Sequence, residues 1–400
     1  MGTATIRSVN SGVQAGARVL VAMSGGVDSA VVAGLLKRDG YDVVGVTLHL
    51  WDAPPEERIG RCCAPEDRQD ARRVCDTLAI PHYVIDERDS FRSEVVEPYM
   101  EGLLQGLTPL PCATCNSFVK LDRLLAIADM YGAEFIATGH YARLSPAMPG
   151  GAPRVGAGQD TKKDQSYFLF GLSEKLRRRL LFPLGETSKT AARQLAEDLG
   201  LPVAHKRDSQ ELCFVPTGDV AGFMRREGRP LASGRIVDES GETLAHHDGS
   251  QSFTAGQRRG LGLGALRPAG SPTQNQRDSA HRNQAQRAEV KARFVLRTLS
   301  SGDVVVGDEA RLMSQTLSVA QAVWQSDTPQ TFEARVKIRH GHLPASATIT
   351  RAGGGFRADF FQQQRAITPG QGAVIYDEEG FVLGGGFVAP ESLSLEALSV

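Results

Sequence analysis

Apolar runs alternate with amphipathic stretches through the first half of the chain. Short, strand-like apolar runs occur at residues 18–23, 41–50, 82–85 and 133–137. Stretches with helical spacing of apolar side chains lie between them, at residues 30–37, 67–78 and 119–131. This rhythm is typical of a parallel sheet with helices on both faces. We therefore predict an α/β fold that begins with a doubly wound, Rossmann-like parallel sheet.

The pattern changes after about residue 214. Short β-like segments separated by glycine and charged turns follow, at residues 234–238, 303–307, 332–338 and 372–376. Such segments predict a small central domain followed by a C-terminal β-barrel. The predicted division is a mobile N-terminal extension at 1–17, a catalytic domain at 18–212, a central domain at 213–272, a polar insertion at 273–292 and the barrel at 293–400. The insertion is rich in Gln, Arg, Asn and Ala, which cannot build a core, so it is either a solvated excursion or an RNA-contacting segment.

Charge and hydropathy narrow the class of protein. The chain of 400 residues has a formal net charge of -1, which excludes a globally cationic surface but not local basic patches that bind nucleic acid. No apolar run approaches the roughly 20 residues that span a bilayer. Residues 1–17 lack the profile of a secretory signal. We expect a cytoplasmic protein that does not enter the membrane.

The most informative motif is SGGVDS at residues 24–29, between a predicted strand and a predicted helix. Glycines allow a tight turn that brings backbone N–H groups close to an anion. The helix is expected to start at about Ser29, so its N-terminal N–H groups face the same point. Ser24 and Ser29 add hydroxyl donors, and Asp28 either holds Mg²⁺ or orders the loop. The alternative is a glycine-rich turn with a capping serine.

The loop is not a Walker motif, because G-x-x-x-x-G-K-[ST] is missing and no lysine is expected to reach into it. Such a loop suits attack at the α-phosphate of ATP, which releases AMP and pyrophosphate. It resembles the loop of the ATP-pyrophosphatase (PP-loop) superfamily, the adenylating enzymes that include GMP and NAD synthetases and tRNA thiolases. The resemblance implies ATP contacts at Ala22, Met23, Ser24, Gly25, Gly26, Val27, Asp28 and Ser29, and adenine or ribose contacts at Leu48 and Gly139.

All six cysteines lie in the first 213 residues, and we expect them to be thiols: Cys62, Cys63, Cys75, Cys112, Cys115 and Cys213. The C-x-x-C pair Cys112 and Cys115 is compatible with a redox disulfide, half of a metal site, or a nucleophile with an assisting thiol. A four-cysteine zinc site fails on count, because Cys213 is the only later cysteine. A helix starting at about residue 119 would favour the thiolate form of the pair through its dipole. Cys62, Cys63 and Cys75 are predicted to be structural.

Several motifs in order resemble the bacterial MnmA-type tRNA-specific 2-thiouridylase family. They lie at residues 108–116, 137–142, 163–169, 182–185, 208–214, 253–262, 367–371 and 384–386. The resemblance extends from about Arg18 to Ala389. Each motif alone is weak, and the ordered set is specific. One departure is Leu110, which stands where the family usually has an asparagine that helps to hold the target base.

The resemblance implies roles for the thiols. Cys115 corresponds to the nucleophile, and Cys213 to the cysteine that carries sulfur as a persulfide. Cys112 stands where some members have an aspartate proposed as a general acid/base. Other members have cysteine there, and for these a [4Fe-4S] cluster on Cys112, Cys115 and Cys213 is the alternative. We favour the persulfide relay.

The implied reaction is adenylation of the C2 oxygen of the wobble uridine in tRNA, followed by sulfur transfer to give 2-thiouridine, AMP and pyrophosphate. ATP, Mg²⁺, tRNA and a sulfur-donor protein, either a cysteine desulfurase or a sulfur-relay protein, are the implied cofactors and partners of a monomeric enzyme. The implied tRNA contacts are Lys163, Asp164, Gln165, Arg339 and His340, for which a solvated basic turn is the alternative.

Two rival functions share part of this pattern. An amide synthetase of the adenylating type would use the loop but would not need Cys115 or Cys213. A non-catalytic RNA-binding relative would need neither the thiols nor Asp28. Substitution of these residues therefore separates the three functions.

Overall fold

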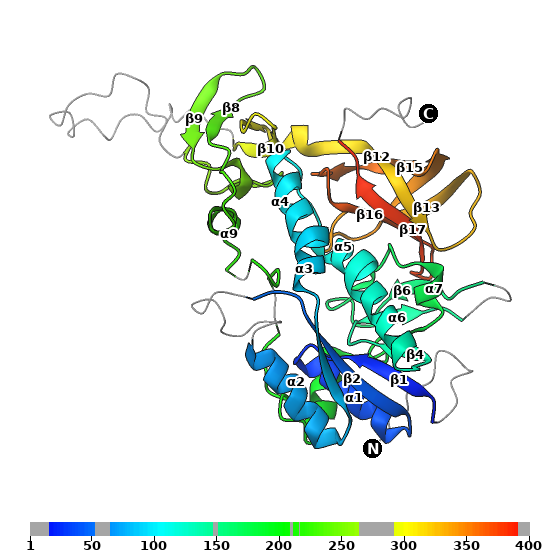
Figure 1. Ribbon diagram of the computed structural model, residues 1–400. Helices are drawn as coiled ribbons and strands as arrows, with labels where there is room; N and C mark the ends of the chain where they lie inside the picture. Colours follow the sequence, from blue (N-terminus) through cyan, green and yellow to red (C-terminus); the bar gives the residue numbers. More distant parts are fainter. Residues whose placement is uncertain are drawn as a thin grey trace, which may run out of the picture.

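The computed structural model describes residues 16–52, 65–146, 151–208, 211–215, 217–263 and 292–390. Nearly all of the expected N-terminal extension and of the polar insertion, as well as Cys62 and Cys63, lie outside these residues. Figure 1 shows the catalytic domain at the bottom, the central sheet at the upper left and the barrel at the upper right. No helix within the described ranges is long and apolar enough to cross a membrane.

The catalytic domain is built on a five-stranded sheet in which every neighbouring pair is parallel. Its order is β3-β2-β1-β4-β7, with bounds β1 Arg18–Ala22, β2 Asp42–His49, β3 His82–Asp86, β4 Phe135–Ala137 and β7 Leu180–Leu181. The apolar runs form the central strands β1 and β2 because both faces of the sheet are covered there, whereas the edge strand β3 is partly exposed. The predicted doubly wound α/β fold is confirmed.

Two apolar cores lie on opposite faces of this sheet. One core contains the buried sides of α1 (Val27–Arg38), α2 (Pro65–Leu78) and α8 (Lys189–Asp198). The other contains α3 (Arg88–Phe91), the π-helical turn Arg92–Val96, α4 (Glu97–Leu104) and α6 (Leu121–Met130). The second core also contains Cys115, the predicted nucleophile.

A continuous helical segment carries the C-x-x-C pair. It begins with α5 (Pro111–Thr114), passes through a π-helical turn at Cys115–Lys120 and continues as α6. Proline at the first position of α5 suits a helix start because its missing N–H would have no partner there. The predicted start at about residue 119 is therefore wrong, since amphipathic spacing is interrupted by the π turn and does not extend to the true start.

Smaller elements complete the catalytic domain. They are the hairpin of β5 (Ala142–Leu144) with β6 (Val155–Ala157), a 3₁₀ turn at Ser166–Phe168 and the short helix α7 (Glu174–Arg177). Ser173 caps α7 by accepting a hydrogen bond from the backbone of Leu176.

The central domain combines α9 (Val220–Arg226) with a four-stranded sheet and a 3₁₀ turn at Ser250–Ser252. The sheet order is β10-β11-β8-β9, with β8 Gly234–Val237, β9 Thr243–His247, β10 Phe294–Thr298 and β11 Val304–Gly307. Residues 294–307 therefore belong to the central sheet, although the sequence analysis placed them in the barrel domain. The reason is that β11 pairs with β8, far earlier in the chain, and such a pairing leaves no local signal.

After a 3₁₀ turn at Glu309–Leu312, the C-terminal domain is a closed six-stranded barrel, which confirms the predicted architecture. Its order is β12-β15-β14-β13-β16-β17, with β12 Met313–Trp324, β13 Thr331–Lys337, β14 Ala345–Ala352, β15 Gly355–Arg365, β16 Gly372–Tyr376 and β17 Val382–Val388. All neighbouring strands are antiparallel. Closure removes exposed sheet edges.

The barrel packs directly on the segment that leads into α5. The backbone N–H of Thr108 donates to the carbonyl of Pro369 at 3.0 Å, and the amide of Gln371 donates to the carbonyl of Thr108 at 3.0 Å. The Tyr167 hydroxyl donates to the carbonyl of Gly372 at 3.0 Å.

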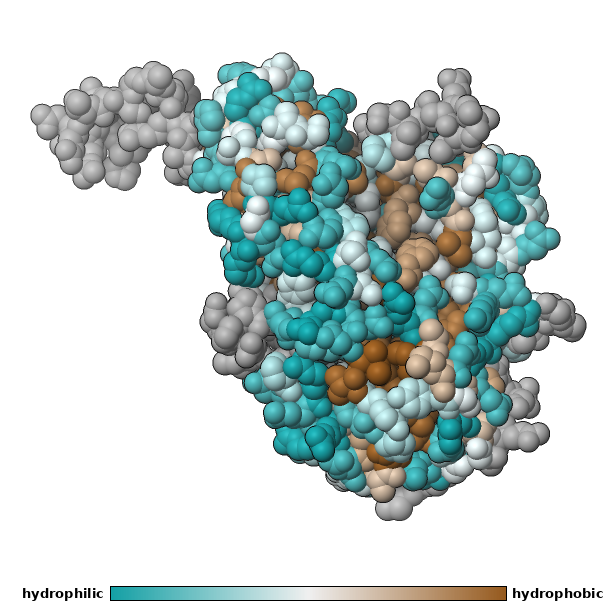
Figure 2. Space-filling view, in the orientation of Figure 1, coloured by the Kyte–Doolittle hydropathy of each residue, from teal (hydrophilic) through white to brown (hydrophobic). Residues whose placement is uncertain are grey.

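The face of the molecule seen in Figure 2 is mainly hydrophilic, with an apolar patch just below its centre.

Candidate active site

The nucleotide loop lies between the end of β1 and the start of α1, as the sequence predicts. Gly25 has a φ of +74°, and a methyl group there would lie 2.1 Å from the backbone oxygen of Asp67, so only glycine fits. The Ser24 N–H donates to Ser29 Oγ at 3.2 Å, and the two hydroxyls lie 3.1 Å apart. Helix α1 begins at Val27 with its free N–H groups facing this loop, which is the arrangement that binds phosphate.

Two lysines from later parts of the chain reach the loop, so the expectation that no lysine reaches in is wrong. Lys189 Nζ lies 2.8 and 2.9 Å from the two carboxylate oxygens of Asp28. Lys206 Nζ donates to the carbonyl of Gly25 at 3.0 Å and pairs with Asp67 and Asp70. Burial would lower the pKa of Lys206, but its hydrogen bonds with the two carboxylates outweigh burial and raise it. The loop therefore has cations beside it despite lacking a Walker lysine.

Asp28 is also held by Tyr141, whose hydroxyl donates to Asp28 Oδ1 at 2.8 Å. Burial, and next the negative charge of Asp28, raise the pKa of Tyr141. Gly139 lies against the loop as expected, since a methyl group there would be 2.9 Å from both Asp28 Cβ and the Ser29 nitrogen. Leu48 lies near the end of β2, buried in the same core as the thiols.

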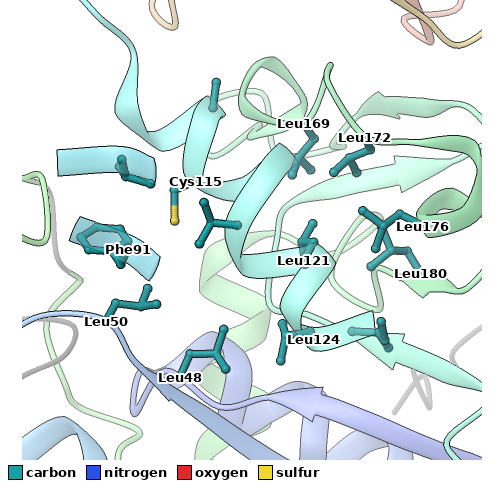
Figure 3. Packing of buried hydrophobic residues seen from close by; sticks show 14 of the residues in the cluster. Leu48, Leu50, Phe91, Cys115, Leu121, Leu124, Leu169, Leu172, Leu176 and Leu180 are labelled. Carbon is teal, nitrogen blue, oxygen red and sulfur yellow. The ribbon is translucent and has the colours of Figure 1, made fainter. Parts of the chain in front are cut away.

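Cys115 lies in the apolar core between the sheet and the π-helical turn. Figure 3 shows its sulfur beside Phe91, with Leu50 and Leu48 on the side of the sheet. Burial raises the pKa of the Cys115 thiol, and the charge and backbone N–H of Lys120 offset this only in part. Burial and the neighbouring Cys115 raise the pKa of Cys112 to about 11. The expected thiolate form is therefore wrong for both residues: desolvation outweighs the helix dipole.

Lys120 is a residue that sequence reasoning missed. It ends the π-helical turn that starts at Cys115, so one wide turn places it over that residue. Its charge acts on Cys112, Cys115 and His140, whose pKa burial lowers well below its usual range with Lys120 contributing. Among the residues that the structure describes, no carboxylate pairs with Lys120. The signal that could have found it is a lysine five residues after the predicted nucleophile.

Cys213 is followed directly by a residue at the centre of an aromatic cluster. The following residue, Phe214, is buried, and its ring contacts those of Tyr99, Phe91 and Trp51 at centroid distances of 5.3, 5.8 and 6.3 Å. Burial, and next the charge of Cys112, raise the pKa of Tyr99 to about 12, so Tyr99 lies between the two cysteine segments. Cys213 packs against the same core as Cys115. Cys112 and Cys115 lie on one helical segment, Cys115 and Cys213 contact the same large apolar core, and none of the three forms a disulfide.

The thiols do not fit a metal centre as they are arranged. Within the described ranges, no three His, Cys, Asp or Glu side chains are gathered so that they could hold a metal ion. Cys75 is a separate thiol, fully buried on α2 in the core of the opposite face, a position that suits the structural role predicted for it.

Two of the predicted tRNA-binding residues, Asp164 and His340, are 176 positions apart in the chain. They lie next to each other at the junction of the catalytic domain and the barrel. His340 Nε2 lies 3.1 Å from the carbonyl oxygen of Asp164. Asp164 is buried and accepts from the backbone of Gly158 and Ser166, so its side chain supports the turn.

The remaining predicted tRNA residues have partners within the protein. Gln165 accepts from the Tyr141 backbone at 2.9 Å, Lys163 pairs with Asp208 at 2.7 Å, and Arg339 donates to the carbonyl of Arg365 at 2.9 Å. Leu110, at the position that usually carries asparagine, packs against the thiol core and Gly372.

Three family models match the chain in the order of its domains. They are the tRNA methyl transferase HUP domain at residues 17–217, the tRNA methyl transferase PRC-barrel domain at 222–273 and the aminomethyltransferase beta-barrel domain at 314–388. An HUP-type nucleotide domain followed by these two modules defines a multidomain transferase.

Relatives that align with nearly the whole chain narrow this class to one family. The tRNA-specific 2-thiouridylase MnmA of Sorangium cellulosum is 44% identical over 380 residues, covering 93% of this chain and 92% of that protein. That of Koribacter versatilis is 41% identical, covering 92% and 98%. The chain belongs to the MnmA family of tRNA-specific 2-thiouridylases.

Solved structures resemble the chain more remotely. The U34-tRNA thiolase NcsA from Methanococcus maripaludis with its [4Fe-4S] cluster matches with a TM-score of 0.35 and 16% identity, covering 56% of this chain and 72% of that one. A 4-thiouridine synthetase–RNA complex with bound ATP matches with a TM-score of 0.33 and 18% identity, covering 50% and 46%.

Proposed function

We propose that this tRNA-specific 2-thiouridylase adenylates the C2 oxygen of the wobble uridine and then replaces that oxygen with sulfur from a persulfide on Cys213. The proposal is supported by one observation: the nucleotide loop and Cys115 adjoin the same apolar core. Cys115, Leu48 and Ala22 share one apolar cluster, and Ala22 leads directly into the phosphate loop. A base held between loop and thiols would thus face both reagents.

The first step uses the loop. The uridine O2 attacks the α-phosphorus of ATP, the bond between the α- and β-phosphates breaks, and pyrophosphate leaves toward the N–H groups at Ser24–Ser29. The C2 carbon then carries AMP as a good leaving group. Asp28 would hold Mg²⁺, which neutralises phosphate charge when bound. Lys189 and Lys206 add positive charge beside the leaving pyrophosphate.

The second step uses the thiols. The terminal sulfur of the Cys213 persulfide forms a bond to C2, and AMP leaves with the bonding pair. The Cys115 thiolate attacks the inner sulfur of Cys213, which breaks the S–S bond to the transferred atom and leaves a Cys115–Cys213 disulfide. Two electrons from an external thiol then restore both cysteines. Because burial raises the pKa of Cys115, its proton must be removed as the base is seated, and Lys120 is placed to stabilise the thiolate.

The remaining parts of the proposal concern partners. The turn at Lys163–Gln165 and the pair Arg339 and His340 form the tRNA-facing junction of catalytic domain and barrel, with Lys163 and Arg339 supplying phosphate contacts. A sulfur-donor protein loads Cys213, and the enzyme acts as a cytoplasmic monomer. We propose a persulfide on Cys213 in preference to a cluster held by Cys112, Cys115 and Cys213.

The test is nucleoside mass spectrometry of tRNA incubated with the protein, ATP, Mg²⁺, a cysteine desulfurase supplied with cysteine as the persulfide donor, and a dithiol reductant. The wild type is expected to produce 2-thiouridine, and Cys115→Ser and Cys213→Ser are expected to produce none. Cys75→Ala is the matched control, because this thiol lies in the other core and should leave the product yield unchanged. Activity that survives both serine substitutions would contradict the thiol relay. Iron and labile sulfide bound to anaerobically purified active protein would contradict the persulfide route.

A further inference from the structure

The side chain of Asn116, next to Cys115 in the π-helical turn, is buried without a polar partner. Asn116 is only 6% exposed, yet no residue within the described ranges forms a hydrogen bond with its carboxamide. Gln325 is equally buried, but both ends of its carboxamide are used: Oε1 accepts from the Val155 N–H at 2.9 Å, and Nε2 donates to the Phe170 carbonyl at 2.9 Å. Because a buried amide without a partner lowers stability, its presence at Asn116 calls for a functional explanation.

The amide of Asn116 borders solvent-accessible space. The hydroxyl of the next residue, Ser117, is fully enclosed without a partner, whereas neither polar atom of the Asn116 amide is among the described atoms that are enclosed in this way. Cys112 lies four residues before Asn116 and Lys120 four residues after it, so the three share one side of the helical segment. Cys112 and Lys120 are both partly exposed. The three residues therefore form a partly open strip in which the amide lies between a thiol and an ammonium group.

This strip is close to the part of the sheet that contacts the phosphate loop. Burial lowers the pKa of His140 well below its usual range, and the charge of Lys120 adds to this effect, so the two side chains are near each other. His140 directly follows Gly139, where a methyl group would lie 2.9 Å from Asp28 Cβ. The amide is thus on the side of the thiol helix from which a base could reach both reagents.

The reaction determines which edge of the uracil ring the protein can hold. O2 must face the α-phosphorus and C2 must face the attacking sulfur, so the N3–H donor and the O4 acceptor remain for recognition. These two groups are neighbours on the ring, and a carboxamide offers an acceptor and a donor side by side. An ammonium group only donates, and a thiol is weak in both roles. Within the strip, Asn116 is therefore the side chain that matches both groups.

We propose that Asn116 holds the target uracil, accepting from N3–H through its oxygen and donating to O4 through its nitrogen. This contact leaves O2 free to face ATP, and both ends of the buried amide then have partners. The inference rests on the proposed function, and it adds the residue that orients the base within that site.

The test uses full-length protein and tRNA that carries either uridine or 4-thiouridine at the wobble position, with saturating ATP, a cysteine desulfurase with cysteine, and a dithiol. In Asn116→Leu, which has an apolar side chain of similar shape, kcat/KM for the uridine tRNA should fall about thirtyfold, as expected for two neutral hydrogen bonds. Sulfur is a weak acceptor, so 4-thiouridine should lower the wild-type value about fivefold and leave that of Asn116→Leu unchanged. Both proteins should bind an ATP analogue with a methylene group between the α- and β-phosphates equally well.

Stability separates this role from a structural one. Because the amide has no partner among the described residues, Asn116→Leu should leave the midpoint of denaturant unfolding unchanged or raise it. Gln325→Leu is the matched control, and its midpoint should fall because the Val155 N–H and the Phe170 carbonyl lose their partner. A midpoint that falls as far in Asn116→Leu as in Gln325→Leu overturns the inference.

The kinetic outcomes also distinguish the alternatives. A wild-type rate in Asn116→Leu, or an equal effect of 4-thiouridine on both proteins, overturns the inference. Weaker binding of the ATP analogue by Asn116→Leu would assign the amide to the adenine ring and overturns it as well. If the wild type produces no 2-thiouridine, the proposed function itself fails, whereas an active wild type with an equally active Asn116→Leu defeats this inference alone.

Discussion

Tyr141 and Lys189 donate to the same carboxylate oxygen of Asp28, at 2.8 Å each. The tyrosine comes from the segment after β4 and the lysine from the start of α8, so two elements far apart in sequence fix one side chain of the phosphate loop. The ammonium group of Lys189 also lies 5.9 Å from the centre of the Tyr141 ring. Asp28 is therefore oriented before any ligand has to order it, which would reduce the entropic cost of binding the proposed Mg²⁺ and ATP.

Removal of the Tyr141 hydroxyl should weaken the site without unfolding it. A hydrogen bond to a charged partner contributes about 1.5 kcal/mol or more, so Tyr141→Phe is expected to raise the KM for ATP about tenfold. The value of kcat should change less, because the hydroxyl does not touch the thiols. Tyr83→Phe, at an exposed tyrosine on β3, provides the comparison. Measurement of tRNA-dependent pyrophosphate release gives both constants, and an unchanged KM would exclude this role for Tyr141.

Gly25 allows a matched test of the loop's shape. Gly25→Ala should lower ATP affinity at least about thirtyfold, because positive φ costs about 1–2 kcal/mol in any L-residue and the methyl would also overlap Asp67. Gly40 also has a positive φ, of +86°, but a methyl there would meet nothing within 4 Å. Gly40→Ala should therefore lose about 1–2 kcal/mol of stability and keep normal affinity. Equal affinities of the two variants in calorimetric titration would show that the close approach to Asp67 is unimportant.

The reactivity of the buried thiols should depend on pH in a stated direction. Because burial raises the pKa of Cys115 above its ordinary value of 9.0, its alkylation should still be increasing with pH above pH 9. Lys120 favours the thiolate, so Lys120→Met should move this profile further toward high pH and slow alkylation at pH 8 about fivefold. Lys120→Arg should preserve the profile, a result that a purely packing role would not produce. A profile that moves toward low pH in Lys120→Met would contradict the electrostatic role.

The aromatic cluster should matter for both stability and sulfur transfer. Phe214 is buried among four aromatic rings, so Phe214→Ala is expected to cost about 3–5 kcal/mol in the free energy of unfolding. Phe214→Leu keeps most of the volume and should cost about 1.5 kcal/mol or less. Phe361→Ala, at an exposed site, should cost about 0.5 kcal/mol or less. Denaturant unfolding gives these values, and 2-thiouridine yield below the melting range should fall most in Phe214→Ala.

The sequence predicted those features that depend on residues close to one another in the chain. The phosphate loop is six consecutive residues, and the central strands β1 and β2 are almost fully buried, so each leaves a short apolar run. Cys112 and Cys115 were found for the same reason, through the spacing of the C-x-x-C pair. The role of Cys213, and the expectation that it acts with the pair, came from the family resemblance and not from the residues themselves.

The features that it missed depend on contacts between distant segments. Lys189 and Lys206 reach a loop that lies more than 160 positions earlier, and nothing around either lysine indicates this partner. The raised pKa of Cys115 depends on how deeply tertiary packing buries it, which outweighs the local effect of the helix. The pairing of β11 with β8 joins strands that are not neighbours in sequence. These properties follow from three-dimensional packing, and single-sequence patterns do not carry them.

The backbone hydrogen bond between Thr108 and Pro369 has a practical consequence for anyone who wishes to shorten this enzyme. A fragment that stops before the barrel would retain the whole phosphate loop and every cysteine, and therefore all the predicted catalytic residues. It would nevertheless lose the support beneath the peptide that enters α5, and with it the fixed orientation of Cys112 and Cys115. We therefore expect the smallest active fragment to include the last strands of the chain. These strands contribute no reacting atom, but they support the helical segment that carries Cys112 and Cys115.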